Sequence, residues 1–174
     1  MGPSSTSSAR ARLFERIDSY VQNLRIDGQA SAALRVARLV FQCQHAALDA
    51  RIEIGRDHGL THGELFSLLL LRACYPDAPV TPTALREAVM LSSGGMAKVL
   101  RHLEERDLVM RSAHATDARS TTLVISDTGA ELIDSIVPQV AERDREMFVG
   151  ALTDAEVQEL TRLLSKVRTA IRLR

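Results

Sequence analysis

The sequence predicts a mostly helical α+β fold, and three observations lead to that prediction. Apolar residues recur at helical spacing through most of the 174 residues. Three helix starts carry capping signals, and a single pair of short segments between residues 108 and 125 is rich in strand-forming residues. Hydrophobic residues make up 45 % of the chain and charged residues 25 %, which is typical of a globular protein.

The N-terminal part of the sequence is predicted to form a tail followed by two helices. Residues 1–11 are rich in small and polar residues, and we expect a flexible tail there. A short helical pattern around Leu13–Leu24 precedes a long one over Ala30–Ile54. Gly59 then ends the long helix, because glycine readily adopts the left-handed conformation that closes a helix. Residues 12–59 are therefore one predicted helical unit.

Three later helices begin with side-chain caps. Thr61–Glu64 and Thr153–Glu156 each match a capping box, in which Thr and Glu satisfy each other's backbone N–H groups. Thr81 precedes a proline, which is favoured at the first helical position. These signals predict helix starts and carry no functional information.

Residues 60–125 have the element order of a winged helix-turn-helix. A short helix over Leu85–Leu91 is followed by a break and a second helix over Met96–Arg106. Leu108–Arg111 and Thr121–Ile125 read as two strands, joined by an exposed hairpin tip over Ser112–Ser120. Helix, turn, helix and two-stranded wing together predict a DNA-binding domain over 60–125.

The C-terminal part of the sequence is predicted to form two more helices. Ser126 caps a helix from about Asp127 to Gly150, which we expect Pro138 to kink or split. The last helix, from about Asp154, carries apolar residues spaced three and four apart: Val157, Leu160, Leu164, Val167 and Ile171. Such a stripe needs a partner, and a second copy of the chain is the simplest one. Residues 12–59 and 126–174 are thus expected to form a dimerisation lobe.

Candidate DNA contacts lie on the second helix of this motif and on the wing. Small residues at the helix start would let its backbone N–H groups reach a phosphate, while basic side chains beyond them would reach bases and backbone. Because the formal net charge is zero, local charge must supply the attraction. The alternative to DNA contact is that Lys98 and Arg101 belong to an ordinary solvated helix face beside Glu104 and Glu105. The candidates are Ser92, Ser93, Gly94, Gly95, Lys98 and Arg101 on the helix, and Arg111, His114, Asp117 and Arg119 on the wing.

These segments resemble the multiple-antibiotic-resistance regulator (MarR) family. The resemblance covers roughly residues 30–172 and rests on Leu60–Glu64, Thr81–Leu85, Leu91–Val109 and the wing motif Asp117-Ala118-Arg119. It implies a homodimer that holds two winged helices over a palindromic, double-stranded operator. Lys98 stands where family members often place a base-contacting arginine, and Arg119 is the wing-tip arginine. Asp107 stands where the family usually has glycine and must adopt a left-handed conformation, which Asp tolerates.

The resemblance also implies a small-molecule effector, often an anionic aromatic compound. The candidates for its binding site are Arg38, His45, His62, Arg72 and Arg86. The urate-responsive branch of the family is not matched, because the chain contains no Trp. We therefore predict a ligand-responsive regulator, most simply a repressor. Two alternatives on the same scaffold are a dimeric small-molecule-binding protein without DNA binding and a thiol redox sensor.

Other classes of function find no support in the sequence. It has no phosphate-binding glycine loop, no nucleophile elbow and no metal-hydrolase motif, so we predict no enzyme and no cofactor. His58 and His62 lack a third ligand at metal-site spacing. The two cysteines, Cys43 and Cys74, are expected to be small core residues in a reducing compartment. With no signal peptide or apolar span, we expect a cytoplasmic protein that does not contact membranes.

Overall fold

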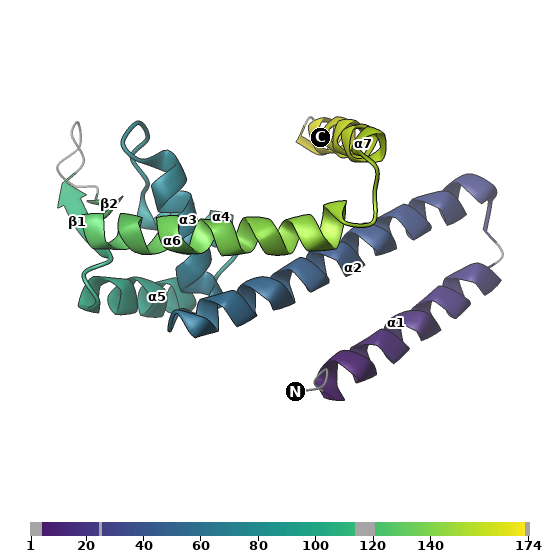
Figure 1. The fold of residues 1–174 in the computed structure, drawn as a ribbon, viewed down its shortest axis with the longest axis horizontal. Coiled ribbons are helices and arrows are strands. Elements are labelled where there is room, and N and C mark those ends of the chain that lie inside the picture. Colours follow the sequence, from purple (N-terminus) through teal and green to yellow (C-terminus); the bar gives the residue numbers. More distant parts are fainter. Residues whose placement is uncertain (1–4, 25, 114–120, 173–174) are drawn as a thin grey trace. The chain divides into compact units, whose positions relative to one another are not determined.

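The fold of the chain was examined in a computed structural model, which describes residues 5–24, 26–113 and 121–172. Within these ranges the chain forms seven α-helices, one π-helical turn and one two-stranded sheet (Figure 1). In chain order they are α1 (Ser5–Asn23), α2 (Gly28–Asp57), α3 (His62–Cys74), α4 (Pro82–Val89), α5 (Ser93–Glu105), β1 (Val109–Ala113), β2 (Thr121–Ile125), α6 (Asp127–Asp144), the π turn η1 (Arg145–Val149) and α7 (Asp154–Arg172). The mostly helical winged helix-turn-helix fold is thereby confirmed.

Two compact units divide the chain, residues 1–46 and residues 47–174. The first holds α1 and the N-terminal half of α2. Its helices meet through an aromatic cluster in which Phe41 lies 4.4 Å from His45 and 6.4 Å from Phe14, measured between ring centroids. Helix α1 begins at Ser5, inside the stretch that we expected to be a tail.

The second unit is built around a buried apolar core contributed by α3, α4, α5, α6 and the sheet. Leu68, Leu103, Ile133 and Ile136 are completely inaccessible to solvent. Four apolar residues of α5, namely Met96, Val99, Leu100 and Leu103, are buried in this core. Burial of this kind orients α5, because its apolar face must stay on the core while the opposite face remains in water.

The wing is an antiparallel pair in which Val109 faces Ile125 and Ala113 faces Thr121. Leu123 also donates its N–H to the carbonyl of Val80, with an N···O distance of 2.8 Å, so the loop before α4 extends the sheet by one bridge. Figure 1 shows the hairpin beside the N-terminal end of α6, with α3, α4 and α5 close to it. The wing is therefore anchored to the helical core at its base.

The predicted helix starts are confirmed in atomic detail. Thr61 and Glu64 form the full capping box at α3, and Thr153 and Glu156 form the same pair of bonds at α7. Thr81 caps α4 with proline at the next position. Gly59 has a φ of +66° after α2, as predicted for the residue that ends a helix.

Some predicted boundaries differ from the structure. Helix α4 ends at Val89 because Met90 adopts a left-handed conformation with a φ of +56°. Helix α5 begins at Ser93, three residues before the predicted start at Met96, so Gly94 and Gly95 form the tight entry into the helix and lie in its first turn. Pro138 does not split α6, which continues as an α-helix to Asp144 and changes to a π turn only at Arg145. No described helix combines the length and apolar character needed to cross a membrane.

Candidate DNA-binding site

The start of α5 is an open, exposed helix N-terminus. Ser92 is its N-cap, and the Ser92 hydroxyl accepts a hydrogen bond from the N–H of Gly95 at 3.1 Å. Ser92, Ser93 and Gly94 are exposed, and a Cβ atom added at Gly94 would meet nothing within 4 Å. Unpaired N–H groups and the helix dipole make such a terminus attractive to an anion. A phosphate group can therefore approach the backbone here without steric hindrance.

Lys98 and Arg101 follow on the exposed side of α5. Lys98 has no ion-pair partner within the described ranges, so its ammonium group is available to a ligand. Arg101 lies 3.9 Å from Glu105, one turn further along the same helix. An exposed pair at that distance contributes little, so the Arg101 guanidinium can exchange Glu105 for a phosphate at small cost.

Arg111 at the base of the wing has a different role from Lys98. Its Nε donates to Oε1 of Glu104 at 2.7 Å, which connects β1 to α5. This contact orients the wing relative to α5 and also neutralises part of the charge on Arg111. The sequence indicated Glu104 only as a neighbouring acid. The remaining predicted wing residues, His114, Asp117 and Arg119, lie outside the described residues.

Asp107 occupies the turn between α5 and the wing in the predicted left-handed conformation, with a φ of +53°. Its carbonyl accepts a hydrogen bond from the hydroxyl of Ser126 at 2.6 Å. The same hydroxyl accepts the N–H of Gly129 and caps α6. The turn after α5 is thus fixed to the start of α6.

The five candidate ligand residues lie in two different units, and each set is described separately. In the first unit His45 packs against Phe41 and Phe14, and Arg38 lies on the same helix. In the second unit Arg72 makes a bidentate contact with Asp134, and this contact holds the pKa of the Asp134 carboxyl below its ordinary value. Arg86 contacts its neighbour Glu87 at 3.1 Å. Both of these arginines are therefore already paired.

His62 is the candidate that borders a pocket. It stacks on Phe66 with ring centroids 5.8 Å apart. A hollow of about 470 Å³ is lined by Ile52, Arg56, Gly59, Leu60, Thr61 and His62. Burial lowers the pKa of His62 below its ordinary value of 6.5, and the nearby charge of Arg51 lowers that pKa further. His62 is therefore neutral at physiological pH, and Arg56, which sequence reasoning missed, is the cation of this pocket.

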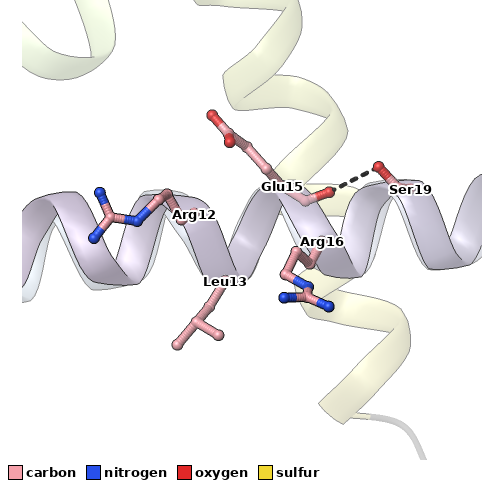
Figure 2. A pocket seen from close by; sticks show the side chains of 5 residues that line it. All are labelled: Arg12, Leu13, Glu15, Arg16 and Ser19. Carbon is pink, nitrogen blue, oxygen red and sulfur yellow. Dashed lines mark hydrogen bonds between the residues drawn. The ribbon is translucent and has the colours of Figure 1, made fainter.

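A second hollow lies along α1 in the first unit. It has a volume of about 740 Å³ and is lined by Arg12, Leu13, Glu15, Arg16 and Ser19, as Figure 2 shows. The one hydrogen bond drawn there runs from the Ser19 hydroxyl to the Glu15 carbonyl at 3.2 Å, within the helix. All five lining residues belong to one helix, so they do not converge around a ligand as the groups of a built site do.

The prediction that both cysteines are small core residues is wrong for Cys43. Cys43 is exposed and Cys74 is partly buried. The reason is geometric: Cys43 lies on a side of α2 that also exposes Leu39 and Val40, four and three residues earlier in the helix. Within the described residues no group of three or more His, Cys, Asp and Glu side chains is arranged to hold a metal ion.

Comparisons with known proteins agree with this geometry. The sequence profile described as "MarR family" matches residues 65–121. The transcriptional regulator MhqR of Bacillus subtilis is 33 % identical over 110 residues, which span 63 % of this chain and 73 % of MhqR. The regulator MgrA of Staphylococcus aureus is 25 % identical over 116 residues, which span 66 % of this chain and 74 % of MgrA.

Solved structures show the same fold. The apo form of MarR from Escherichia coli superimposes with a TM-score of 0.65 at 23 % identity, covering 75 % of this chain and 94 % of MarR. MepR of Staphylococcus aureus, solved in complex with DNA, gives a TM-score of 0.64 at 19 % identity and covers 77 % of this chain and 96 % of MepR. The fold and the similarity to these regulators define a winged helix-turn-helix, DNA-binding transcriptional regulator. The chain belongs to the MarR family.

Proposed function

We propose that the protein is a homodimeric, sequence-specific repressor that binds a palindromic operator and is released from it by a small anionic aromatic ligand. The observation that carries the DNA-binding part is the N-terminal end of α5, where an open, glycine-containing first turn is followed by the exposed, unpaired Lys98. The N-terminus would hold a phosphate, and Lys98 would reach a base edge. Because its proposed partner is DNA, the protein is also proposed to act in the cytoplasm.

Exposed apolar side chains support the homodimer. Helix α7 carries Leu160, Leu164, Val167 and Ile171 on its surface, each more than 40 % exposed. In the first unit, Leu13, Ile17, Tyr20, Leu39, Val40 and Phe41 are exposed as well. Monomers rarely leave such an area in water, because each buried apolar side chain would contribute about 1.5–3 kcal/mol. A second copy of the chain, with the same apolar surfaces, is the partner that the proposal assigns.

The pocket beside His62 supports the effector part of the proposal. Arg56 offers a positive charge to an anionic group, while Ile52 and Leu60 offer apolar contact. The Nδ1 atom of His62 is buried and has no hydrogen-bond partner among the described residues. A carboxylate-bearing aromatic ring matches this combination. Of the five candidate residues, we keep His62 as the ligand contact and add Arg56.

The salt dependence of DNA binding tests the role of Lys98. The probe is a duplex recovered by selection with the purified protein, titrated at several salt concentrations. Loss of one contact in Lys98→Ala should cost about 1–3 kcal/mol, and loss of a phosphate contact should also lower the slope of log affinity against log salt by about one. Lys166→Ala on α7 is the matched control and should bind like the unmodified protein. Unchanged affinity in Lys98→Ala would remove this residue from the interface.

A further inference from the structure

Two polar contacts connect the last turns of α5 to the segment that joins α2 and α3. His102 Nδ1 lies 3.0 Å from Oε1 of Glu64, and Arg106 Nη1 donates to the carbonyl oxygen of Gly59 at 2.8 Å. His102 and Arg106 are four residues apart, so they lie one above the other on the same side of the helix axis. Both of their partners fall within residues 58–64, which we call the α2–α3 junction.

The Glu64 carboxylate is held from two directions. Only 4 % of Glu64 is accessible to solvent, and its Oε2 accepts the N–H of Thr61 at 2.7 Å in the capping box of α3. Because a buried carboxylate needs hydrogen-bond partners on each oxygen, the second oxygen depends on His102. Since the capping box fixes the Glu64 side chain, the contact with His102 fixes a point on α5 relative to the start of α3.

Arg106 supplies the second fixed point. It is the C-cap residue of α5, and its guanidinium reaches the carbonyl oxygens of Gly59 and, at 3.5 Å, His58. These carbonyls follow the last turn of α2, where a helix has unpaired acceptors and a cation is favourable. The left-handed conformation of Gly59 ends α2 at the position from which its carbonyl contacts Arg106.

The backbone of α3 at Gly63 also lies close to a side chain of α5. A Cβ atom added to Gly63 would lie 3.2 Å from Cγ2 of Val99 on α5. This close approach leaves little freedom for sliding between the two helices. The apolar face decides which side of α5 meets the core, and the two polar contacts restrain the smaller rotations about the helix axis that this packing leaves.

We propose that His102 and Arg106 are positioning residues, which set the orientation of α5 from the α2–α3 junction and do not themselves contact DNA. The inference rests on the proposed function in that α5 is taken as the helix that reads DNA. The orientation of α5 would then contribute to the sequence specificity of DNA binding, in addition to the side chains that face the DNA groove. Loss of either contact would leave α5 folded but able to adopt several orientations, only one of which fits the operator.

Four variants of the full-length protein test the proposal. His102→Leu and Arg106→Ala remove the contacts. His102→Asn places an amide N–H where Nδ1 of the imidazole lies and keeps the contact with Glu64. Lys98→Ala is the comparison variant for a residue that touches DNA. Circular dichroism at the assay temperature establishes that each variant is folded, and Arg106→Lys replaces Arg106→Ala if the latter is not.

The first readout is DNA binding. His102→Leu and Arg106→Ala should each weaken binding to the selected duplex about tenfold, which corresponds to one lost hydrogen bond to a charged group. Binding to a random-sequence duplex and the salt slope should not change, whereas Lys98→Ala should lower the slope. His102→Asn should restore most of the affinity. A lower salt slope in the His102 or Arg106 variants would show direct DNA contact and overturn the proposal.

The second readout is amide hydrogen exchange in the free protein, which needs no DNA. Exchange should accelerate over residues 93–105 and 58–64 in His102→Leu and Arg106→Ala, and stay slow in His102→Asn. Unchanged exchange in both removal variants would overturn the positioning role, even if DNA binding were weaker. Failure of the unmodified protein to bind any duplex would contradict the proposed function, and the exchange data would still decide whether the contacts restrain α5.

Discussion

At the scale of single residues, Gly129 is restricted by the close approach of two backbone segments. A Cβ atom built on Gly129 would lie 2.2 Å from the carbonyl oxygen of Leu108 and 3.0 Å from Cγ1 of Ile125. Real Cβ contacts are never that short, so a larger residue would push the first turn of α6 away from the base of the wing. The close approach of the Leu108 carbonyl therefore explains why this position is occupied by glycine in the chain.

Replacement of Gly129 by alanine should destabilise the fold. We expect Gly129→Ala to lower the free energy of unfolding by about 3 kcal/mol, the upper range for an overpacked core site. Urea denaturation followed by circular dichroism measures the change. Gly28→Ala is the control, because a Cβ at Gly28 meets nothing within 4 Å. Equal stability of the two variants would contradict the close approach of the Leu108 carbonyl to Gly129.

His62 predicts a pH dependence of stability. Burial and the charge of Arg51 lower the pKa of His62 in the folded state below the value of 6.5 that it has in the unfolded chain. The unfolded chain therefore binds the proton more tightly, and stability falls as the pH drops below about 6.5. Above that pH the contribution of His62 is complete. The same sign follows from the desolvation of any partly buried histidine.

Comparison with His62→Gln isolates this effect. Denaturant titrations of both proteins between about pH 5 and pH 8 should show that the unmodified protein loses more stability on acidification than the variant. All other titrating groups contribute alike to both curves. Parallel curves over this range would contradict the lowered pKa of His62.

Some residue conformations were predictable from sequence and others were not. Asp107 was expected to be left-handed because the family usually has glycine there, and its φ of +53° confirms it. Met90 carried no such signal, since methionine is neither a common turn residue nor a helix breaker. Met90, with its φ of +56°, stands between Val89, which is buried in the core, and Leu91, which packs against it. Tertiary packing decides that boundary, and local sequence does not reveal it.

At the scale of elements, helix starts were predicted better than helix ends. A capping box depends on two residues only three positions apart, so the helix start at Thr61 and Glu64 can be predicted from the local sequence. The π turn at Arg145–Val149 has no comparable local signal. The contact between Glu64 and His102 joins residues 38 positions apart, and a single sequence does not show which residues so distant will meet. The candidate site was therefore predicted in its helix but not in its supporting contacts.

The N-cap of α5 can be tested as an element. Ser92→Ala removes the acceptor for the N–H of Gly95 and should lower the free energy of unfolding by about 1 kcal/mol. Ser93→Ala changes the neighbouring first-turn residue and should have a smaller effect, because Ser93 is not the cap. Denaturant unfolding of the two variants measures the difference. Equal stability of the two variants would show that Ser92 does not cap the helix.

At the scale of the whole molecule, the proposed dimer predicts that charge introduced on the apolar stripe of α7 prevents dimerisation. Leu164→Glu and Val167→Glu place carboxylates on the exposed apolar stripe and should convert dimer to monomer at micromolar concentration. Gln158→Glu adds the same charge beside the stripe and should leave the dimer intact. Sedimentation equilibrium distinguishes these states. An unmodified protein that sediments as a monomer would contradict the dimer directly.

The central claim is that α5 reads a specific duplex as part of a twofold assembly. The most direct test is selection of genomic fragments by the purified protein at near-physiological salt, followed by sequencing of what is retained. The account predicts an enriched inverted repeat with half-sites about one helical turn, or a multiple of it, apart, and loss of that enrichment in Lys98→Ala. Absence of any enriched sequence from folded, dimeric protein, with and without added aromatic carboxylates, would contradict it.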